Sequence, residues 1–207
     1  WQKEKWYWLA AVVLGVLLSL LFAAHWTEGY ADMIQKGIGG KVVRFHVLAN
    51  SDSEADQTLK LAVRDRVLQE YGDLLETCTS KEETLAALKN AQQEISETAE
   101  AEVLAQGYTY PVRVSLVREE FPFKKYGDLI FPAGVYDALR IEIGEAKGKN
   151  WWCVLYPQMC YVDAAWGYST EESHVRLQNT LTKEEFLVVS AMEQKKVTPK
   201  IKCRLVE

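Results

Sequence analysis

The feature that most constrains the fold of this chain is an uncharged apolar run near its N-terminus, Leu9 to Ala24, which reads LAAVVLGVLLSLLFAA. Two lysines and several aromatic residues precede the run. A positive end followed by an apolar stretch is typical of segments that enter a membrane. As a helix the run covers about 24 Å, slightly less than a hydrocarbon core of roughly 30 Å unless the flanking aromatics are included. We therefore predict that residues 1–26 form a membrane anchor or a signal segment.

The sequence leaves two fates open for this segment. It either stays as an anchor or is removed by a signal peptidase, for which Gly29, Tyr30 and Ala31 provide a small-x-small site downstream of the run. A third interpretation, a helix buried in a globular core, is disfavoured. Both favoured fates place the remainder of the chain outside the cytoplasm.

The remainder divides into a linker, residues 27–40, and an exported globular domain, residues 41–207. The linker ends in the glycine-rich stretch GIGG, which we interpret as a hinge, because a phosphate-binding loop would follow a strand and here a strand follows it. That strand, KVVRFHVLAN, leads into a helix that starts with Ser and Asp caps at SDSEAD. A second helix is expected from the capping box Ser80 and Glu83 to Gly107.

The second half of the domain reads mainly as strands. A loop is expected over residues 158–180, a third helix from Thr182 to about Glu193, and a closing strand in PKIKCRLVE. The fold class predicted is α+β, a mostly antiparallel sheet with about three helices packed on it. The expected strands, of which the last two read as a hairpin, are YPVRVSLVRE, LIFPAGVY, DALRIEIG and WWCVLYP.

Composition and motifs argue against several function classes. The chain has a formal net charge of −5 and no block of basic residues, so nucleic acid is not an expected partner. The three histidines, His25, His46 and His174, are isolated and the zinc-binding spacings are missing, so no metal or cofactor is expected. A serine nucleophile elbow, G-x-S-x-G, does not occur.

Acidic residues cluster where the first strand meets the first helix, at Asp52, Glu54 and Asp56. Carboxylates in a first helical turn usually cap free N–H groups and complement the helix dipole, and we favour this interpretation. The alternative is a cell-envelope hydrolase whose acid and base groups are Asp52, Asp56 or Glu142.

The stretch NWWCVLYPQMCYVD, residues 150–163, holds two of the four cysteines. Outside the cytoplasm a cysteine pair is expected to be oxidised, and six intervening residues are too many for a catalytic redox pair. We predict a disulfide between Cys153 and Cys160, and leave open the pairing of Cys78 and Cys203. Six aromatic residues lie in or near this stretch and are expected to fill the core or form a protein interface: Trp151, Trp152, Tyr156, Tyr161, Trp166 and Tyr168.

Two blocks of the sequence, RFHVLANSDSEADQTLKLAVRDRVL and FPAGVYDALRIEIGEAKGKNWWCVLYPQMCYVD, closely resemble the stage II sporulation protein R family of endospore-forming bacteria. The resemblance implies a signalling protein, not an enzyme, that is exported from the forespore into the intermembrane space, anchored or released after cleavage. Its implied partner is a membrane-embedded aspartic peptidase in the mother cell, which then cleaves the sigma-E precursor. Gln158 departs from the pattern, since a second proline is expected after Pro157.

The candidate partner-binding residues lie in two places, the loop from Asn50 to Asp56 and the stretch from Lys147 to Tyr161. A membrane-anchored binding domain for another envelope component is the remaining alternative. The candidates are Arg44, His46, Asn50, Ser51, Asp52, Asp56, Trp151, Trp152, Tyr156 and Tyr161; further positions in the second block are Gly134, Tyr136, Asn150, Pro157 and Asp163.

Overall fold

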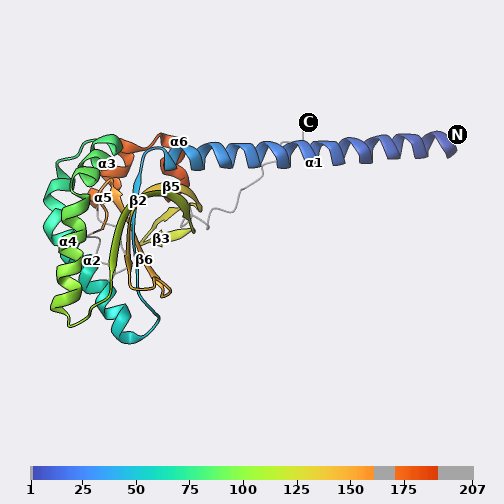
Figure 1. Cartoon of the computed structure of the whole chain (residues 1–207). Coiled ribbons are helices and arrows are strands. Elements are labelled where there is room, and N and C mark those ends of the chain that lie inside the picture. The colour runs from blue at the N-terminus through green and yellow to red at the C-terminus, as the bar shows by residue number, and fades with distance from the viewer. Residues whose placement is uncertain (1, 161–170, 191–207) are drawn as a thin grey trace.

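The computed structural model describes residues 2–160 and 171–190, and its most prominent feature is the long first helix, α1 (Gln2–Gly39). This helix projects from a globular body (Figure 1). Its apolar window is long enough to cross a membrane, and none of the window is buried against the rest of the chain. The buried core helix considered from the sequence is therefore wrong, while an anchor and a cleaved signal both fit the structure.

The last turns of α1 belong to the globular body. Ile34 and Ile38 are buried, and the Lys81 ammonium donates to the Gly39 carbonyl at 2.7 Å, where a cation complements the C-terminal end of the helix dipole. Residues 27–39 are thus helical, and the interpretation of GIGG as a hinge is wrong, because a buried isoleucine and a buried lysine fix this end.

The body is built on a four-stranded mixed sheet in the order β2-β5-β1-β6. Strand β1 (Val43–Leu48) pairs in parallel with β5 (Gly134–Ile143) and antiparallel with β6 (Asn150–Tyr156), and β2 (Val112–Phe121) pairs antiparallel with β5. The α+β class and the mostly antiparallel sheet are confirmed. The hairpin expected between β5 and β6 is wrong, because β1 lies between these two strands.

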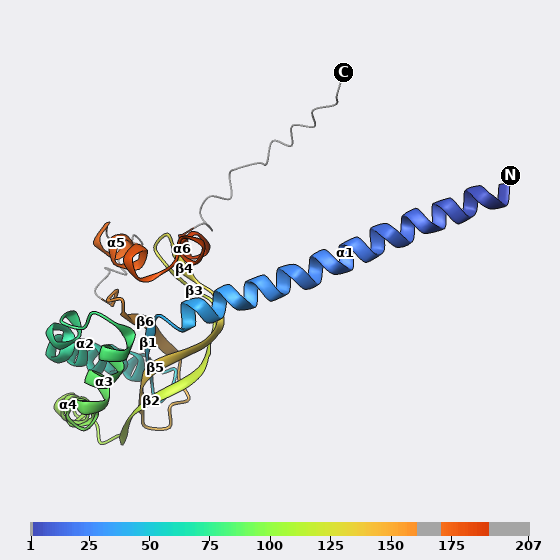
Figure 2. The same ribbon diagram turned by 90° about the horizontal axis from the view of Figure 1, so that it is seen from above.

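Three helices cover one side of this sheet (Figure 2). They are α2 (Glu54–Glu76), α3 (Lys81–Asn90) and α4 (Gln92–Ala105). The single helix expected between Ser80 and Gly107 breaks at Ala91, although its caps are as predicted: the Ser80 hydroxyl accepts from the Glu83 N–H, and Gly107 has a φ of 85°. Apolar side chains of β1, β5 and β6 meet these helices in the first core, which holds Phe45, Leu139, Ile141 and Leu155.

A second core lies on the other side of the sheet. It joins the end of α1 to the short hairpin of β3 (Lys124–Tyr126) and β4 (Leu129–Phe131) and to helices α5 (Glu171–Thr180) and α6 (Lys183–Ser190). Helix α5 occupies part of the expected loop, while α6 begins as predicted, since the Glu185 N–H donates to the Thr182 hydroxyl. The expected closing strand, with Cys203, lies outside the described residues.

Candidate functional site

The two sides of the sheet differ in what their side chains meet. Residues of a strand alternate between the faces, so β1 sends Phe45 and Val47 to the first core and Arg44 and His46 to the other side. The second core covers one end of that other side, and Trp152 lies at its boundary, packed against it. We call the rest the open face; its members, taken from neighbouring positions of the four strands, are Arg113, Ser115, Glu119, Arg140, Glu142, His46, Asn150 and Trp152.

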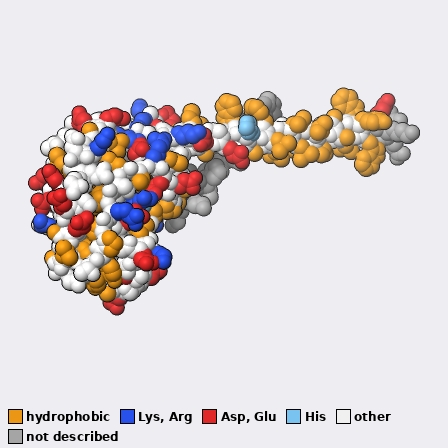
Figure 3. Space-filling view, viewed as in Figure 1, with side chains coloured by type: hydrophobic (Ala, Val, Ile, Leu, Met, Phe, Trp, Pro, Cys, Tyr) orange, Lys and Arg blue, Asp and Glu red, His pale blue; other side chains and the backbone are white. Residues whose placement is uncertain are grey.

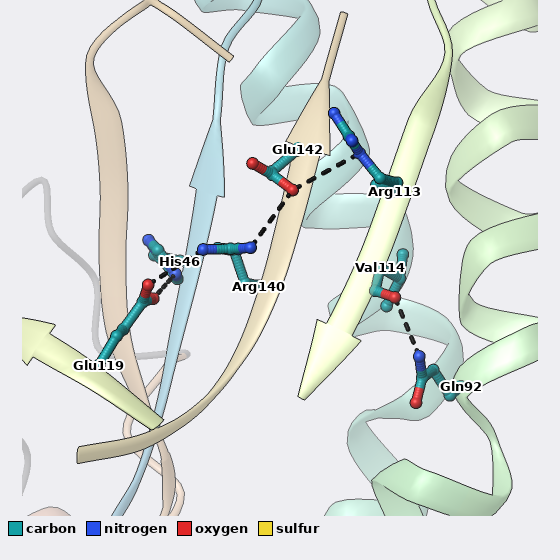
Figure 4. A network of polar contacts seen from close by, with 7 residues as sticks. All are labelled: His46, Gln92, Arg113, Val114, Glu119, Arg140 and Glu142. Atoms are coloured by element: carbon teal, nitrogen blue, oxygen red, sulfur yellow. Dashed lines mark hydrogen bonds and ion pairs between the residues drawn. The ribbon is translucent and has the colours of Figure 1, made fainter. Parts of the chain in front are cut away.

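Charged side chains form a chain of alternating sign across the open face (Figure 4). Glu119 lies 2.5 Å from His46 Nε2 and 3.1 Å from Arg140 Nη1. Arg140 Nη2 lies 3.5 Å from Glu142 Oε2, and the same oxygen lies 3.7 Å from Arg113 Nε. The chain runs from a buried histidine to an arginine whose side chain is 76% exposed, so it links the interior of the sheet to solvent.

His46 is the buried end of this chain, with 3% of its surface exposed. Its ring stacks on Trp152 with centroids 4.8 Å apart. Burial, together with the positive charges of Arg140 and Arg44, lowers the pKa of His46 to about 4. The imidazole is therefore neutral at neutral pH. Its Nδ1 has no hydrogen-bond partner among the described residues, and its Nε2 lies close to Glu119 Oε1 without the direction of a hydrogen bond.

Trp152 gives the open face an aromatic surface. It is half-buried between His46 and Phe121, and the Lys124 ammonium lies 5.3 Å from its ring. Tryptophan and arginine are enriched among the residues that dominate binding energy at protein interfaces, and on this face Trp152 and Arg140 flank His46 on its two neighbouring strands. The open face thus has the composition of a recognition surface.

Beyond the open face, the loop that contains Asn50 to Asp52 packs on the turn between β5 and β6. Asn50 accepts from the Glu145 N–H at 2.9 Å, and Asp52 accepts from the Lys149 N–H at 2.6 Å. A Cβ on Gly144 or Gly148 would overlap this loop, at Asn50 and at Ser51 respectively. We call residues 49–52 and 144–149 the tip. The two blocks singled out in the sequence meet here.

Asp56 is a structural carboxylate. It is 4% exposed and accepts from the Ser51 hydroxyl at 2.5 Å and from the Asn50 amide at 2.9 Å. The bond from Ser51, above all, holds the pKa of Asp56 below its ordinary value. A contact role for Asp56 stays a prediction; in the folded chain its carboxylate is buried and accepts hydrogen bonds from Ser51 and Asn50.

Arg44, a candidate contact residue, also lies inside the protein and is fully buried. Its guanidinium lies 4.8 to 5.6 Å from the centroids of four aromatic rings, donates to the Cys153 carbonyl at 3.1 Å and donates to the Tyr126 hydroxyl at 2.8 Å. Burial lowers its pKa from the ordinary value. The rings are those of Phe121, Tyr126, Phe131 and Tyr136.

Trp151 and Tyr156 lie on the helical side. Trp151 packs edge-on against Phe45, and the Arg64 guanidinium lies 4.7 Å from its ring. The Tyr156 hydroxyl donates to the Thr79 carbonyl at 2.7 Å. Tyr161 and Asp163 lie outside the described residues. Of the candidates, the structure therefore brings His46 and Trp152 together on the open face, and Asn50, Ser51 and Asp52 at the tip.

The predicted disulfide between Cys153 and Cys160 is present, and Cys78 is a free thiol. Gln158, where a proline was expected, bridges two helices: its amide donates to the Gly72 carbonyl and its oxygen accepts from Arg176, both at 3.3 Å.

The arrangement offers no group of three or more metal-ligating side chains among the described residues. The Glu142 carboxylate contacts Arg113 and Arg140, and the Asp52 carboxylate accepts a hydrogen bond from a backbone N–H. Sequence reasoning missed Glu119, Arg140 and Arg113. Arg113 and Arg140 alternate with apolar residues in predicted strands, and Glu119 ends one of these strands. Only the pairing of β2 with β5 and of β5 with β1 brings the three residues together near His46.

Comparison with known proteins identifies the family that this chain matches. The profile described as Stage II sporulation protein R matches residues 39–166, which run from the end of α1 to beyond β6. The Stage II sporulation protein R of Bacillus subtilis (strain 168) is 36% identical over 135 residues, 65% of this chain and 60% of that protein. The chain thus matches about three fifths of the length of this relative. No solved structure matches.

Proposed function

The chain belongs to the stage II sporulation protein R family and has a role in sporulation, and we propose from this premise that it is an exported signal that activates a membrane-embedded aspartic peptidase. The peptidase then cleaves the sigma-E precursor in the mother cell. In this proposal the chain is not an enzyme: it binds the active state of the peptidase more tightly than the inactive state, and each 1.4 kcal/mol of that difference shifts the population about tenfold.

Export is supported by α1 and by the disulfide. The large apolar side chains of α1 are exposed from Trp6 to Met33, along the part that projects from the body (Figure 3), as in a helix that lies in a bilayer or is removed after translocation. A disulfide fits an oxidising compartment outside the cytoplasm. We place the globular body in the space between the forespore and mother-cell membranes.

The single observation that carries the contact proposal is the open face. It presents Trp152 next to a chain of four charged residues at one end of a sheet whose opposite face is covered by three helices. We place the contact with the peptidase on this face and on the adjoining tip, with Trp152, Arg140 and Asp52 as the side chains that make it.

The experiment is co-expression, in a non-sporulating host, of the full chain with the peptidase and a tagged sigma-E precursor, followed by immunoblotting of the precursor. Cleavage is expected with the full chain and is expected to stop when residues 1–26 are deleted, because the body then stays in the cytoplasm. No cleavage by a folded, exported chain would overturn the proposal, and carboxylate-to-amide changes at Asp52 and Glu142 would then test the hydrolase alternative.

A matched pair of variants locates the contact. Trp152→Ala and Trp151→Ala remove the same side chain from neighbouring residues on opposite faces. Trp152→Ala is expected to abolish cleavage at normal exported levels, whereas Trp151→Ala is expected to retain cleavage in proportion to the amount of folded protein. Equal cleavage with both variants, after correction for protein level, would remove the open face from the proposal.

A further inference from the structure

The outer edge of strand β2 ends the sheet and lies beside two open hollows. In the order β2-β5-β1-β6, β2 has a strand neighbour on one side only, and Figure 2 shows it at the margin of the sheet. One hollow, of about 400 Å³, lies between α3 and β2, and the other, of about 690 Å³, lies between α1 and the start of β5. Arg118 lines both hollows, so the strand edge runs between them.

The backbone groups that face outward can be identified from one hydrogen bond. In an antiparallel pair the N–H and C=O of a residue point to the same side, and successive residues alternate. The Gln92 amide, from α4, donates to the Val114 carbonyl at 3.0 Å, so Val114 points away from β5. The unbroken register of β2 with β5 then directs the backbone of Leu116, Arg118 and Glu120 outward as well.

These three positions have open backbone groups. Within residues 2–160 and 171–190, no hydrogen bond from another element is recorded for the main chain of Leu116, Arg118 or Glu120. The Gln92 amide occupies only the outward carbonyl of Val114. The edge from Leu116 to Glu120 stays accessible. An exposed row of N–H and C=O groups is a template for a further strand.

The side chains around the edge define the chemistry of such a strand. Lys89 of α3 is exposed and forms no ion pair among the described residues, and Arg118 is 65% exposed. Asp137, the acidic residue in the hollow, is already bound by Lys81 at 2.6 Å and by Arg118 at 3.3 Å. Leu85 and Leu116 supply apolar surface. The exposed cations Lys89 and Arg118 suit a segment that carries an acidic side chain, and the apolar surface of Leu85 and Leu116 suits an apolar side chain beside it.

We propose that the outer edge of β2, from Leu116 to Glu120, binds an extended, acidic segment of the peptidase as an added strand of the sheet. Main-chain hydrogen bonds hold the segment, and Lys89 selects its acidic residue, as in other cases of strand addition. This proposal rests on the proposed function, and it names a second contact that is separate from the open face.

The test uses the full chain in detergent and overlapping ten-residue fluorescent peptides that cover the extracytoplasmic segments of the peptidase, with binding measured by anisotropy. Arg118→Pro and Arg118→Thr both remove the guanidinium, but only the proline removes the outward N–H; proline is tolerated on an edge strand at such a position. Circular dichroism and the unfolding midpoint confirm that both variants are folded. We expect Arg118→Pro to bind about tenfold more weakly than Arg118→Thr.

A charge exchange tests the selectivity. Lys89→Glu is expected to weaken binding of an acidic peptide several-fold and to strengthen binding of the same peptide with lysine in place of the acidic residue. The control Lys183→Glu, at an exposed lysine at the start of α6 outside the edge and the tip, is expected to change neither. Equal binding by folded Arg118→Pro and Arg118→Thr would overturn the proposal.

Two outcomes separate this proposal from the proposed function. If the chain triggers cleavage on co-expression but none of the peptides depends on the Arg118 N–H, strand addition is wrong and the function stands. If sedimentation shows a dimer that Arg118→Pro dissociates and Arg118→Thr does not, the edge binds a second copy of this chain, and the peptidase segment is excluded as its occupant.

Discussion

Trp151 and Trp152 are neighbours in β6, yet they belong to different parts of the molecule. Trp151 lies among apolar residues beneath α2, with Phe45 against its edge. Trp152 stacks on His46 at one end of a chain of charges. The same alternation holds along β1, where Phe45 and Val47 face the helices and Arg44 and His46 face away. The first face carries the larger core, whereas the second carries a smaller core at one end and, beside it, the polar groups available for recognition.

The helical face should respond most strongly to truncation. Phe45 is fully buried in the first core, so Phe45→Ala removes a ring and leaves a cavity, at an expected cost of about 3 to 5 kcal/mol in the free energy of unfolding. Chemical unfolding of the full chain in mild detergent, followed by circular dichroism, measures it. A similar loss from Arg140→Ala, on the open face, would contradict the division between the two faces.

The disulfide provides a second test of the helical face, because both of its cysteines pack against the first core. Replacing Cys153 and Cys160 by Ala is expected to lower the free energy of unfolding by about 2.5 kcal/mol, from the greater chain entropy of the unfolded state. The same unfolding experiment with reductant should bring the wild-type chain close to the variant. Cys78→Ser is the control: its thiol is free, and a comparable loss there would contradict a specific role for the bridge.

On the open face the expected effect depends on pH. The pKa of His46 is about 4 in the folded chain and about 6.5 in the unfolded chain. Between these values the unfolded state binds the extra proton, so stability falls as the pH is lowered from about 6.5 to 4. Proton linkage at His46 therefore lowers the free energy of unfolding by about 2 kcal/mol between pH 7 and pH 5.

His46→Gln should remove this loss and leave a flatter profile. The neighbouring groups that face His46 are Glu119, Arg140, Arg44 and Trp152, and the variant keeps all four. Unfolding free energies of wild type and variant at pH 7, 6 and 5 provide the measurement. Parallel profiles would show that His46 is not the group that titrates.

Local patterns in the sequence were enough for part of this structure. The apolar run, the strand of alternating residues that contains Val112 and Val114, the cap at Ser80 and the cysteine pair each act over a few residues, so the sequence alone predicts them. The break at Ala91 was missed because it has no glycine or proline, and α5 because its sequence, EESHVRLQNT, is polar.

The candidate site required long-range information. The parallel pairing of β1 with β5 puts His46 beside Arg140, residues 94 positions apart in sequence, and no local pattern encodes that register. For the same reason Arg44 looked like a surface cation, although four aromatic rings from distant segments enclose it. A charged residue between apolar ones in a strand shows which face it lies on, but not what covers that face.

The smallest effect is expected at the exposed end of the charge chain, and it separates recognition from stability most clearly. Arg113→Gln breaks a contact of 3.7 Å to Glu142 made by a side chain that is 76% exposed. Solvent screens such a pair, so the free energy of unfolding should change by less than about 0.5 kcal/mol. Because the arginine adds positive charge at the edge of the open face, the variant should nevertheless weaken activation in the co-expression assay, and more so at low salt. Arg66→Gln, on the exposed side of α2, loses a similar ion pair, with Glu70, and should leave activation unchanged. If Arg113→Gln and Arg66→Gln activate the peptidase equally, Arg113 has no part in recognition, and the recognition surface ends at Glu142.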